Sequence, residues 1–178
     1  MTQTDIAMLP HKVGDFVVYK SLGIYKINDI RTEKFSGLDP RVYYVMNAAS
    51  DKSSVAYVPV DLKDIDTHLR HILSSDEIDA AISDSRGEEL EWIENPKDRA
   101  AAYDLLLSGG KSADLLRLFK VLTLKRREYA ESHKKLYAGD IRILSAVEKI
   151  ITEEFSFVLG IEKSEVIPYI ISKIEATA

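Results

Sequence analysis

The sequence predicts an α+β fold with two domains: a small SH3- or Tudor-like β-barrel at residues 1–66, then an all-α domain at residues 67–178. In the first part, short runs rich in β-branched and aromatic residues are separated by turn residues, which is typical of small curved strands. In the second part, apolar residues recur every three or four positions, which is the helical period. A chain of 178 residues is long enough for one large or two small domains.

Four runs in the first part are expected to be strands, at residues 13–19, 24–30, 42–46 and 54–58. The polar stretch 49–53 is typical of a hairpin connection. Pro59 ends the last strand, because proline has no N–H for a ladder hydrogen bond. A small open barrel of this kind keeps an exposed strand edge, at which another chain can add a strand.

A connector at residues 61–75 leads to the helical part, where a short helix is expected to start at Ser75. Asn95-Pro96 marks the start of a second helix, since proline fits the first helical position, and Ser108-Gly109-Gly110 ends it. The next helix is amphipathic. Its apolar side carries Leu115, Leu118, Phe119, Leu122 and Tyr129, and its opposite side carries Arg117, Lys120 and Arg127.

Two helices are expected in the final third of the chain, the first of them capped by Asp140. Apolar residues repeat along both helices at helical spacing, and we expect them to form core. They include Ile141, Ile143, Ile150, Phe157 and Ile171.

The net charge of −5 hides a segregation of charge along the chain. Residues 66–91 carry 2 Lys/Arg and 8 Asp/Glu, whereas residues 92–135 carry 10 Lys/Arg and 6 Asp/Glu. The only tryptophan, Trp92, is the first residue of the basic segment 92–135. Cations on a rigid face bind nucleic-acid phosphates through counterion release. A solvated helix face has a similar composition, and a lone tryptophan is commonly a core residue, so both alternatives stay open.

Composition and motifs exclude several other classes. The chain has no cysteine, which removes disulfides and thiolate chemistry, and no apolar run is long enough for a membrane span. The first residues lack the pattern of a secretory signal, so we expect a cytoplasmic protein. No phosphate-binding glycine loop or nucleophile elbow is present, so we expect no enzyme and no cofactor. His68 and His71 could share a helix face, but no further ligand lies nearby, and we expect no metal site there.

Several motifs occur in a distinctive order. In the β part they are Lys12–Tyr19, Gly23, Ile27 with Ile30, Tyr43-Tyr44 and Val58-Pro59-Val60. Further along they are Leu69-Arg70, Trp92, Leu107-Ser108-Gly109, the segment 116–124 followed by Lys125-Arg126-Arg127, and Glu153-Glu154-Phe155-Ser156. Over roughly residues 10–160 this order resembles the CarD/CdnL family of bacterial transcription regulators. The N-terminal Tudor-like domain of that family is shared with transcription-repair coupling factors.

The resemblance implies that the β domain binds the β subunit of RNA polymerase by strand addition, with contacts at Arg31, Val55 and Tyr57. It also implies that the helical domain lies on promoter DNA just upstream of the melted region, where Trp92 is wedged at the minor groove. The cations expected to contact DNA are Lys97, Arg99, Arg117, Lys120, Lys125 and Arg127. Such contacts would stabilise the open complex, because the domain binds that form better than closed duplex.

Two functions therefore remain. The first is a monomeric regulator that binds RNA polymerase and contacts promoter DNA. The second is a protein-interaction adaptor with the same barrel but no productive DNA contact, an alternative favoured by the net acidity of the chain.

Overall fold

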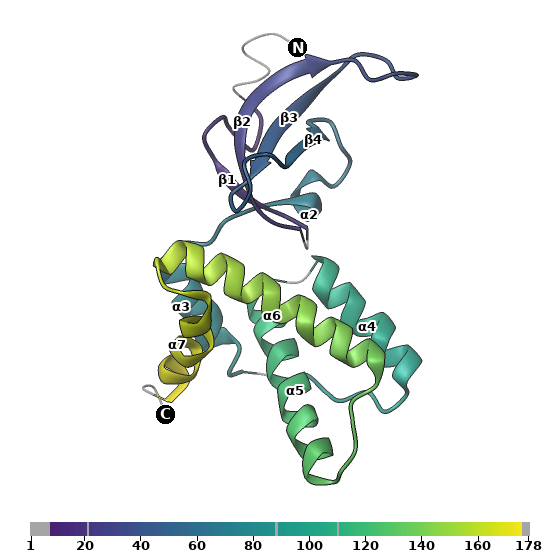
Figure 1. The fold of residues 1–178 in the computed structure, drawn as a ribbon, viewed down its shortest axis with the longest axis vertical. Coiled ribbons are helices and arrows are strands. Elements are labelled where there is room, and N and C mark those ends of the chain that lie inside the picture. Colours follow the sequence, from purple (N-terminus) through teal and green to yellow (C-terminus); the bar gives the residue numbers. More distant parts are fainter. Residues whose placement is uncertain (1–7, 21, 88, 110, 176–178) are drawn as a thin grey trace. The chain divides into compact units, whose positions relative to one another are not determined.

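The computed structural model describes residues 8–20, 22–87, 89–109 and 111–175. The chain forms two compact units, residues 1–72 and residues 73–178, and each is considered by itself (Figure 1). The first unit is a β-sheet and the second is entirely helical, which confirms the predicted two-part α+β class. Residues 1–7, where no secretory signal is expected, lie outside the described residues.

The β unit is a five-stranded antiparallel sheet in the order β4-β3-β2-β1-β5. The four predicted strands are present as β1 (Phe16–Tyr19), β2 (Gly23–Glu33), β3 (Arg41–Ala48) and β4 (Val55–Pro59). A β-bulge between Ile27 and Asp29 interrupts the register of β2 on β3. One face of the sheet forms a core that includes Val17, Ile27, Tyr44, Met46, Val58 and Leu69.

The segment expected to be a connector contains two elements that were not predicted. A single helical turn, α2 (Ile65–His68), leads into β5 (Leu69–His71). Strand β5 pairs antiparallel with β1, with Leu69 opposite Tyr19 and His71 opposite Val17. Leu69 is fully buried. The sheet is therefore completed by residues that follow the boundary predicted after residue 66.

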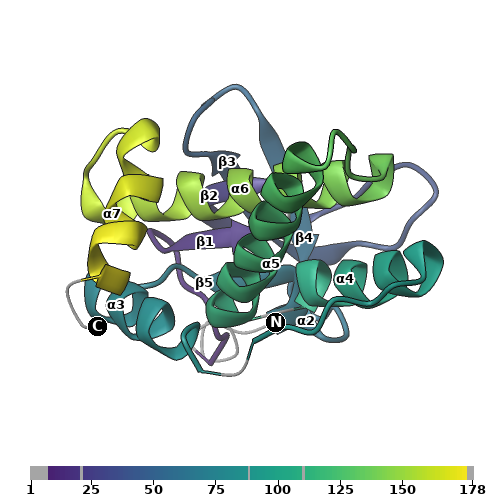
Figure 2. The same cartoon turned by 90° about the horizontal axis from the view of Figure 1, so that it is seen from below.

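The helical unit contains α3 (Ser75–Asp84), α4 (Pro96–Gly109), α5 (Ser112–Glu131), α6 (Ala138–Leu159) and α7 (Lys163–Glu175). Figures 1 and 2 both show α6 crossing α5, and α7 lying beside α3. Helix α6 also packs against α4. The buried core of this unit gathers residues from all five helices, among them Ile82, Tyr103, Leu118, Leu122, Val147, Phe155 and Val166.

Capping hydrogen bonds and a proline at the first helical position determine where the helices start. Ser74 and Glu77 form a capping box at the start of α3, in which each side chain bonds the other residue's backbone N–H. Asn95 caps α4 through its Oδ1, which accepts from the N–H of Lys97 at 2.9 Å, and Pro96 takes the first helical position. Helix α4 ends at Gly109, and the predicted contribution of Gly110 lies outside the described residues.

Two expectations for the final helices are wrong. Ile141, Phe157 and Ile171 are exposed at 48%, 44% and 50%, because their helices pack on one side only and these positions face away from the core. Asp140 does not cap α6, since the N-cap position is Tyr137. Asp140 lies in the first turn instead and is buried. No helix in the described ranges has the length and apolar character needed to cross a membrane.

Candidate protein and nucleic-acid interfaces

Strand β4 forms one edge of the sheet, and its outward-facing backbone groups can be assigned from the ladder. The N–H of Ala48 donates to the C=O of Ser54, and the N–H of Val60 donates to the C=O of Val42, both at 3.1 Å. Residues that bond to β3 alternate with residues that do not. Ala56 and Val58 therefore face β3, whereas the N–H and C=O groups of Val55 and Tyr57 point away from the sheet.

The register brings the three predicted polymerase contacts to one face of the sheet. Arg31 lies opposite Tyr43, and Tyr57 lies opposite Val45. Opposite residues in an antiparallel pair share a face, as do residues two apart in one strand. Arg31, Val55 and Tyr57 thus share the face away from the core, and all three are partly or largely exposed.

An aromatic cluster covers this outer face. The rings of Phe35 and Tyr57 lie 5.2 Å apart between centroids, and those of Phe35 and Tyr43 lie 5.3 Å apart, both edge to face. Tyr43 is buried beneath them, while Phe35 and Tyr57 are each 38% exposed. Phe35 lies between β2 and β3, and only its ring contacts with Tyr43 and Tyr57 show that it belongs to this cluster.

In the helical unit, Trp92 is half-buried at the start of the basic segment and packs against the rim of the core. The guanidinium carbon of Arg99 lies 4.0 Å from the centroid of its ring, and the Lys125 Nζ lies 5.4 Å from it. Tyr129 meets the ring edge to face at 6.2 Å. Tyr137, 57% exposed, lies 5.7 Å from the Arg99 guanidinium. We name these five residues the tryptophan cluster.

Arg99 is held inside the unit by a network of hydrogen bonds. Its Nε and one Nη donate to the two carboxylate oxygens of Asp140, at 2.9 and 2.6 Å. Its other Nη donates to the carbonyls of Ile93 at 2.6 Å and Glu94 at 3.1 Å. These bonds to Asp140 raise the pKa of Arg99 above its ordinary value. Because Arg99 is only 1% exposed, its guanidinium has no free surface for a phosphate in this conformation.

Four other predicted cations form ion pairs with neighbouring carboxylates. Arg117 pairs with Asp114 at 2.8 Å and also donates to the carbonyl of Asp84, while Lys120 pairs with Glu89 at 3.0 Å. Lys125 pairs with Glu128 at 2.8 Å, which raises the pKa of Lys125, and Arg127 pairs with Glu131 at 3.4 Å. Lys97 is exposed in the first turn of α4, and no ion pair among the described residues involves it.

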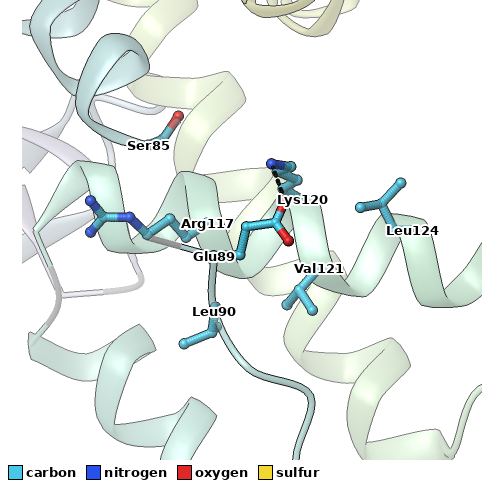
Figure 3. A pocket seen from close by; sticks show the side chains of 7 residues that line it. All are labelled: Ser85, Glu89, Leu90, Arg117, Lys120, Val121 and Leu124. Atoms are coloured by element: carbon cyan, nitrogen blue, oxygen red, sulfur yellow. Dashed lines mark hydrogen bonds and ion pairs between the residues drawn. The ribbon is translucent and has the colours of Figure 1, made fainter. Parts of the chain in front are cut away.

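Four of the six predicted cations lie in two separate groups. Arg117 and Lys120 line a small cavity of about 40 Å³, where the side chains of Lys120 and Glu89 meet (Figure 3). At 3.6 residues per turn, Lys125 is rotated by about 140° from Lys120 around α5 and lies about 8 Å further along it. Lys125 therefore joins Trp92 and Arg99 in the tryptophan cluster, separate from the Arg117–Lys120 pair.

Comparison with known families gives one match. The family described as CarD-like/TRCF RID domain matches residues 11–72. This range covers β1 to β5, including the strand that completes the sheet. The curated proteins contain no match to this chain.

Proposed function

We propose that this protein is a transcription regulator that binds the RNA polymerase β subunit and promoter DNA together, because its residues 11–72 match the family described as CarD-like/TRCF RID domain. In this proposal, the unit of residues 1–72 provides the polymerase-binding domain and the unit of residues 73–178 provides the DNA-contacting domain. The complex stabilises the open promoter. The exposed edge of β4 is the observation that carries the proposal.

The β4 edge supports strand addition as the mode of polymerase binding. Among the described residues, the backbone donors and acceptors of Val55 and Tyr57 have no partner, and a partner strand satisfies them by continuing the ladder. The aromatic cluster on the outer face offers apolar area to the side chains of that strand. Arg31, paired with Glu33 at 2.7 Å and Asp29 at 3.1 Å on the same strand, adds a polar rim.

The tryptophan cluster supports minor-groove contact by the helical unit. Trp92 is packed firmly on one side by Arg99, yet it stays partly accessible and has Lys125 beside it. An apolar ring held rigidly next to a cation suits insertion at a base step, with phosphates bound alongside. In our proposal Arg99 is a positioning residue for Trp92, and Lys97, Arg117, Lys120, Lys125 and Arg127 supply the phosphate contacts.

The carboxylate partners of these cations do not prevent DNA binding. Exposed ion pairs contribute only about 0–1 kcal/mol each, so a phosphate can replace a surface carboxylate at low cost. The pair of Arg127 with Glu131 is 81% and 70% exposed, and the pair of Lys120 with Glu89 is 43% and 79% exposed. By neutralising the cations, these ion pairs weaken the long-range attraction between the helical unit and DNA. The cations therefore bind phosphates only after another contact has placed the unit on DNA.

The polymerase contact can be tested by removing one outward N–H from β4. Val55→Pro deletes that donor at the first residue of the strand, where proline is tolerated, and Val55→Ala keeps it. In a pull-down with the polymerase β subunit, we expect binding to fall at least about tenfold for the proline variant and much less for the alanine variant. Equal binding by both variants would rule out strand addition at β4.

The DNA contact can be tested with Trp92→Ala and Trp92→Phe. We expect Trp92→Ala to shorten the lifetime of the open promoter complex while polymerase binding stays unchanged, and Trp92→Phe to retain part of the effect. Phe157→Ala removes another exposed aromatic residue of the same unit and serves as the control. If Trp92→Ala lowers the unfolding temperature but leaves open-complex lifetime unchanged, Trp92 is a core residue and the DNA proposal fails.

The second function, an adaptor without productive DNA contact, is favoured by the ion pairing of the basic segment. Five of the six predicted cations already have a carboxylate partner, and the whole chain carries a net charge of −5. Salt-dependent binding of the purified protein to a forked promoter fragment separates the two functions. An adaptor shows no binding that depends on Trp92.

A further inference from the structure

Two histidines and one aspartate gather at the end of the β unit opposite to β4. His11 and Asp15 lie just before β1, and His71 ends β5. The possible ligand atoms of these three side chains all lie within 4.8 Å of one another. The His11 and His71 rings approach to 4.4 Å between centroids. His71 is brought to the other two groups by the pairing of β5 on β1 and by the bond of His11 to the carbonyl of Leu69, a contact that neighbouring sequence positions do not reveal.

A hydrogen bond to the backbone orients the ring of His11. Its Nε2 lies 3.1 Å from the carbonyl of Leu69, and because a carbonyl only accepts, Nε2 carries the proton. The lone pair of a neutral imidazole then lies on Nδ1. A ring nitrogen bonded to a backbone carbonyl while the other nitrogen binds metal is the usual arrangement of a ligating histidine.

The Nδ1 atom of His11 has no hydrogen-bond partner among the described residues, although the side chain is 99% buried. A buried polar atom without a partner costs free energy, and such atoms are rare in native proteins. This atom lies in the group formed with Asp15 and His71. A ligand at that point would satisfy it.

The local backbone holds Asp15 next to His11. The N–H of Lys12 donates to the Asp15 carboxylate at 2.8 Å, and the N–H of Asp15 donates to the carbonyl of Lys12 at 3.1 Å. Gly14 allows this tight turn, since it has a φ of 100°. The N–H of Gly14 donates to the carbonyl of Ile27 in β2, and the N–H of Ile27 donates to the carbonyl of Asp15. These two bonds fix the turn to the sheet.

We propose that His11 Nδ1, an oxygen of Asp15 and His71 bind a divalent transition-metal ion of the zinc type. Two imidazoles and a carboxylate are ligands that Zn²⁺ accepts, and water would fill the fourth position of a tetrahedral site. With bonds of about 2.0–2.1 Å, tetrahedral ligands lie roughly 3.3 Å apart, so the group must contract from its present spacing. The exposed His71 and the half-exposed Asp15 provide this movement, while His11 stays in place.

The ion would join the segment before β1 to the end of β5. Strand β5 is only three residues long and pairs with β1 alone in the described sheet. Apart from this pairing His11 bonds the carbonyl of Leu69, so few hydrogen bonds hold the strand. A metal bridge from His71 to His11 and Asp15 would secure this edge strand. The site belongs to the edge of the sheet opposite to β4, and it does not depend on the proposed function.

The test uses the full chain after treatment with a chelator, titrated with ZnCl₂ in a calorimeter. We expect one ion per chain with a Kd below about 10 µM, and a rise of at least about 5 °C in unfolding temperature at saturating Zn²⁺. His71→Ala and Asp15→Asn change the more exposed ligands and keep the buried His11. Each is expected to weaken binding at least about tenfold. His68→Ala, three residues before His71 and outside the group, should bind as the unaltered protein does.

Long-range ¹H–¹⁵N spectra of the histidines give a second reading that does not depend on affinity. We expect an unprotonated Nδ1 on His11 in the metal-free protein, and a shift of this nitrogen on addition of Zn²⁺. The proposal is overturned if the protein binds no Zn²⁺ more tightly than about 100 µM, which is far weaker than protein zinc sites. It is equally overturned if His71→Ala and Asp15→Asn bind as tightly as His68→Ala.

Discussion

Two ion pairs join α4 to α6, one buried and one exposed. Arg99 and Asp140 are 1% and 2% exposed, whereas Asp104 and Arg142 are 48% and 58% exposed. Both pairs have two hydrogen bonds between a guanidinium and a carboxylate. They therefore differ mainly in their access to water, which decides how much the loss of one partner costs.

We expect Asp140→Ala to lower the free energy of unfolding by about 3–5 kcal/mol, because it leaves the Arg99 charge buried without its partner. Asp104→Ala should cost no more than about 1 kcal/mol, since Arg142 stays hydrated. Urea unfolding followed by the fluorescence of Trp92, the only tryptophan, measures both. Similar losses for the two variants would contradict the distinction.

The role of Arg99 could not be predicted from the sequence. An arginine in the first turns of a helix, within a basic segment, is as consistent with a phosphate contact as with a buried pair. Its burial is decided by Asp140, which is 41 residues away and was itself interpreted as a helix cap. Trp92 stays a predicted DNA contact, whereas Arg99, a predicted phosphate contact, covers its ring and is buried.

At the level of elements, the two glycines of α6 have opposite requirements. Gly160 follows the helix with a φ of 66° and a ψ of 31°, the left-handed conformation that ends many helices. Gly139 lies inside the first turn with no positive φ. A Cβ at either position would meet nothing within 4 Å, so only the backbone conformation separates them.

Gly160→Ala should therefore destabilise the helical unit by about 1 kcal/mol, which corresponds to about 2–4 °C in unfolding temperature. Gly139→Ala should leave stability unchanged or raise it by up to about 1 kcal/mol, because alanine is the better helix former. Thermal unfolding followed by circular dichroism compares the two variants. A loss of stability in Gly139→Ala would show that the helix begins later than Ala138.

Elements with a clear period were predictable from the sequence, and short ones were not. The strands β1 to β4 and the helices α3 to α7 follow from alternation, helical spacing and capping residues. Strand β5 has three residues, too few to display a period, and it becomes a strand only through its pairing with β1. The exposed Phe157 and Ile171 show a related limit, because spacing defines an apolar stripe without defining how much of it a neighbour covers.

For the whole molecule, the separation of charge along the chain matters more than its sum. The segment with excess positive charge carries five accessible candidate contacts once the buried Arg99 is set aside: Lys97, Arg117, Lys120, Lys125 and Arg127. Each phosphate contact with duplex DNA contributes about −0.9 to the slope of log affinity against log salt. The number of these contacts therefore sets an upper limit on the salt dependence of the proposed DNA binding.

We expect this slope to be no steeper than about −4.5 for a forked promoter fragment. Lys97→Gln should make the slope shallower by about 0.9, and Trp92→Ala should lower affinity without changing the slope, because an inserted ring releases no counterions. Lys52→Gln alters an exposed lysine of the β unit and serves as the control. Fluorescence anisotropy across a salt series measures all of these, and a slope unchanged by Lys97→Gln would remove that residue from the interface.

The late position of β5 in the chain has a consequence for synthesis on the ribosome. Strands β1 to β4 form neighbouring hairpins that can pair as they emerge, but β1 keeps an open edge until residues 69–71 leave the exit tunnel. Until then Leu69, fully buried in the finished sheet, is missing from the core, and the nascent chain has two unprotected edges. The order of strands therefore makes residues 69–71 the last step in closing the β unit, and a truncation before them exposes an aggregation-prone intermediate.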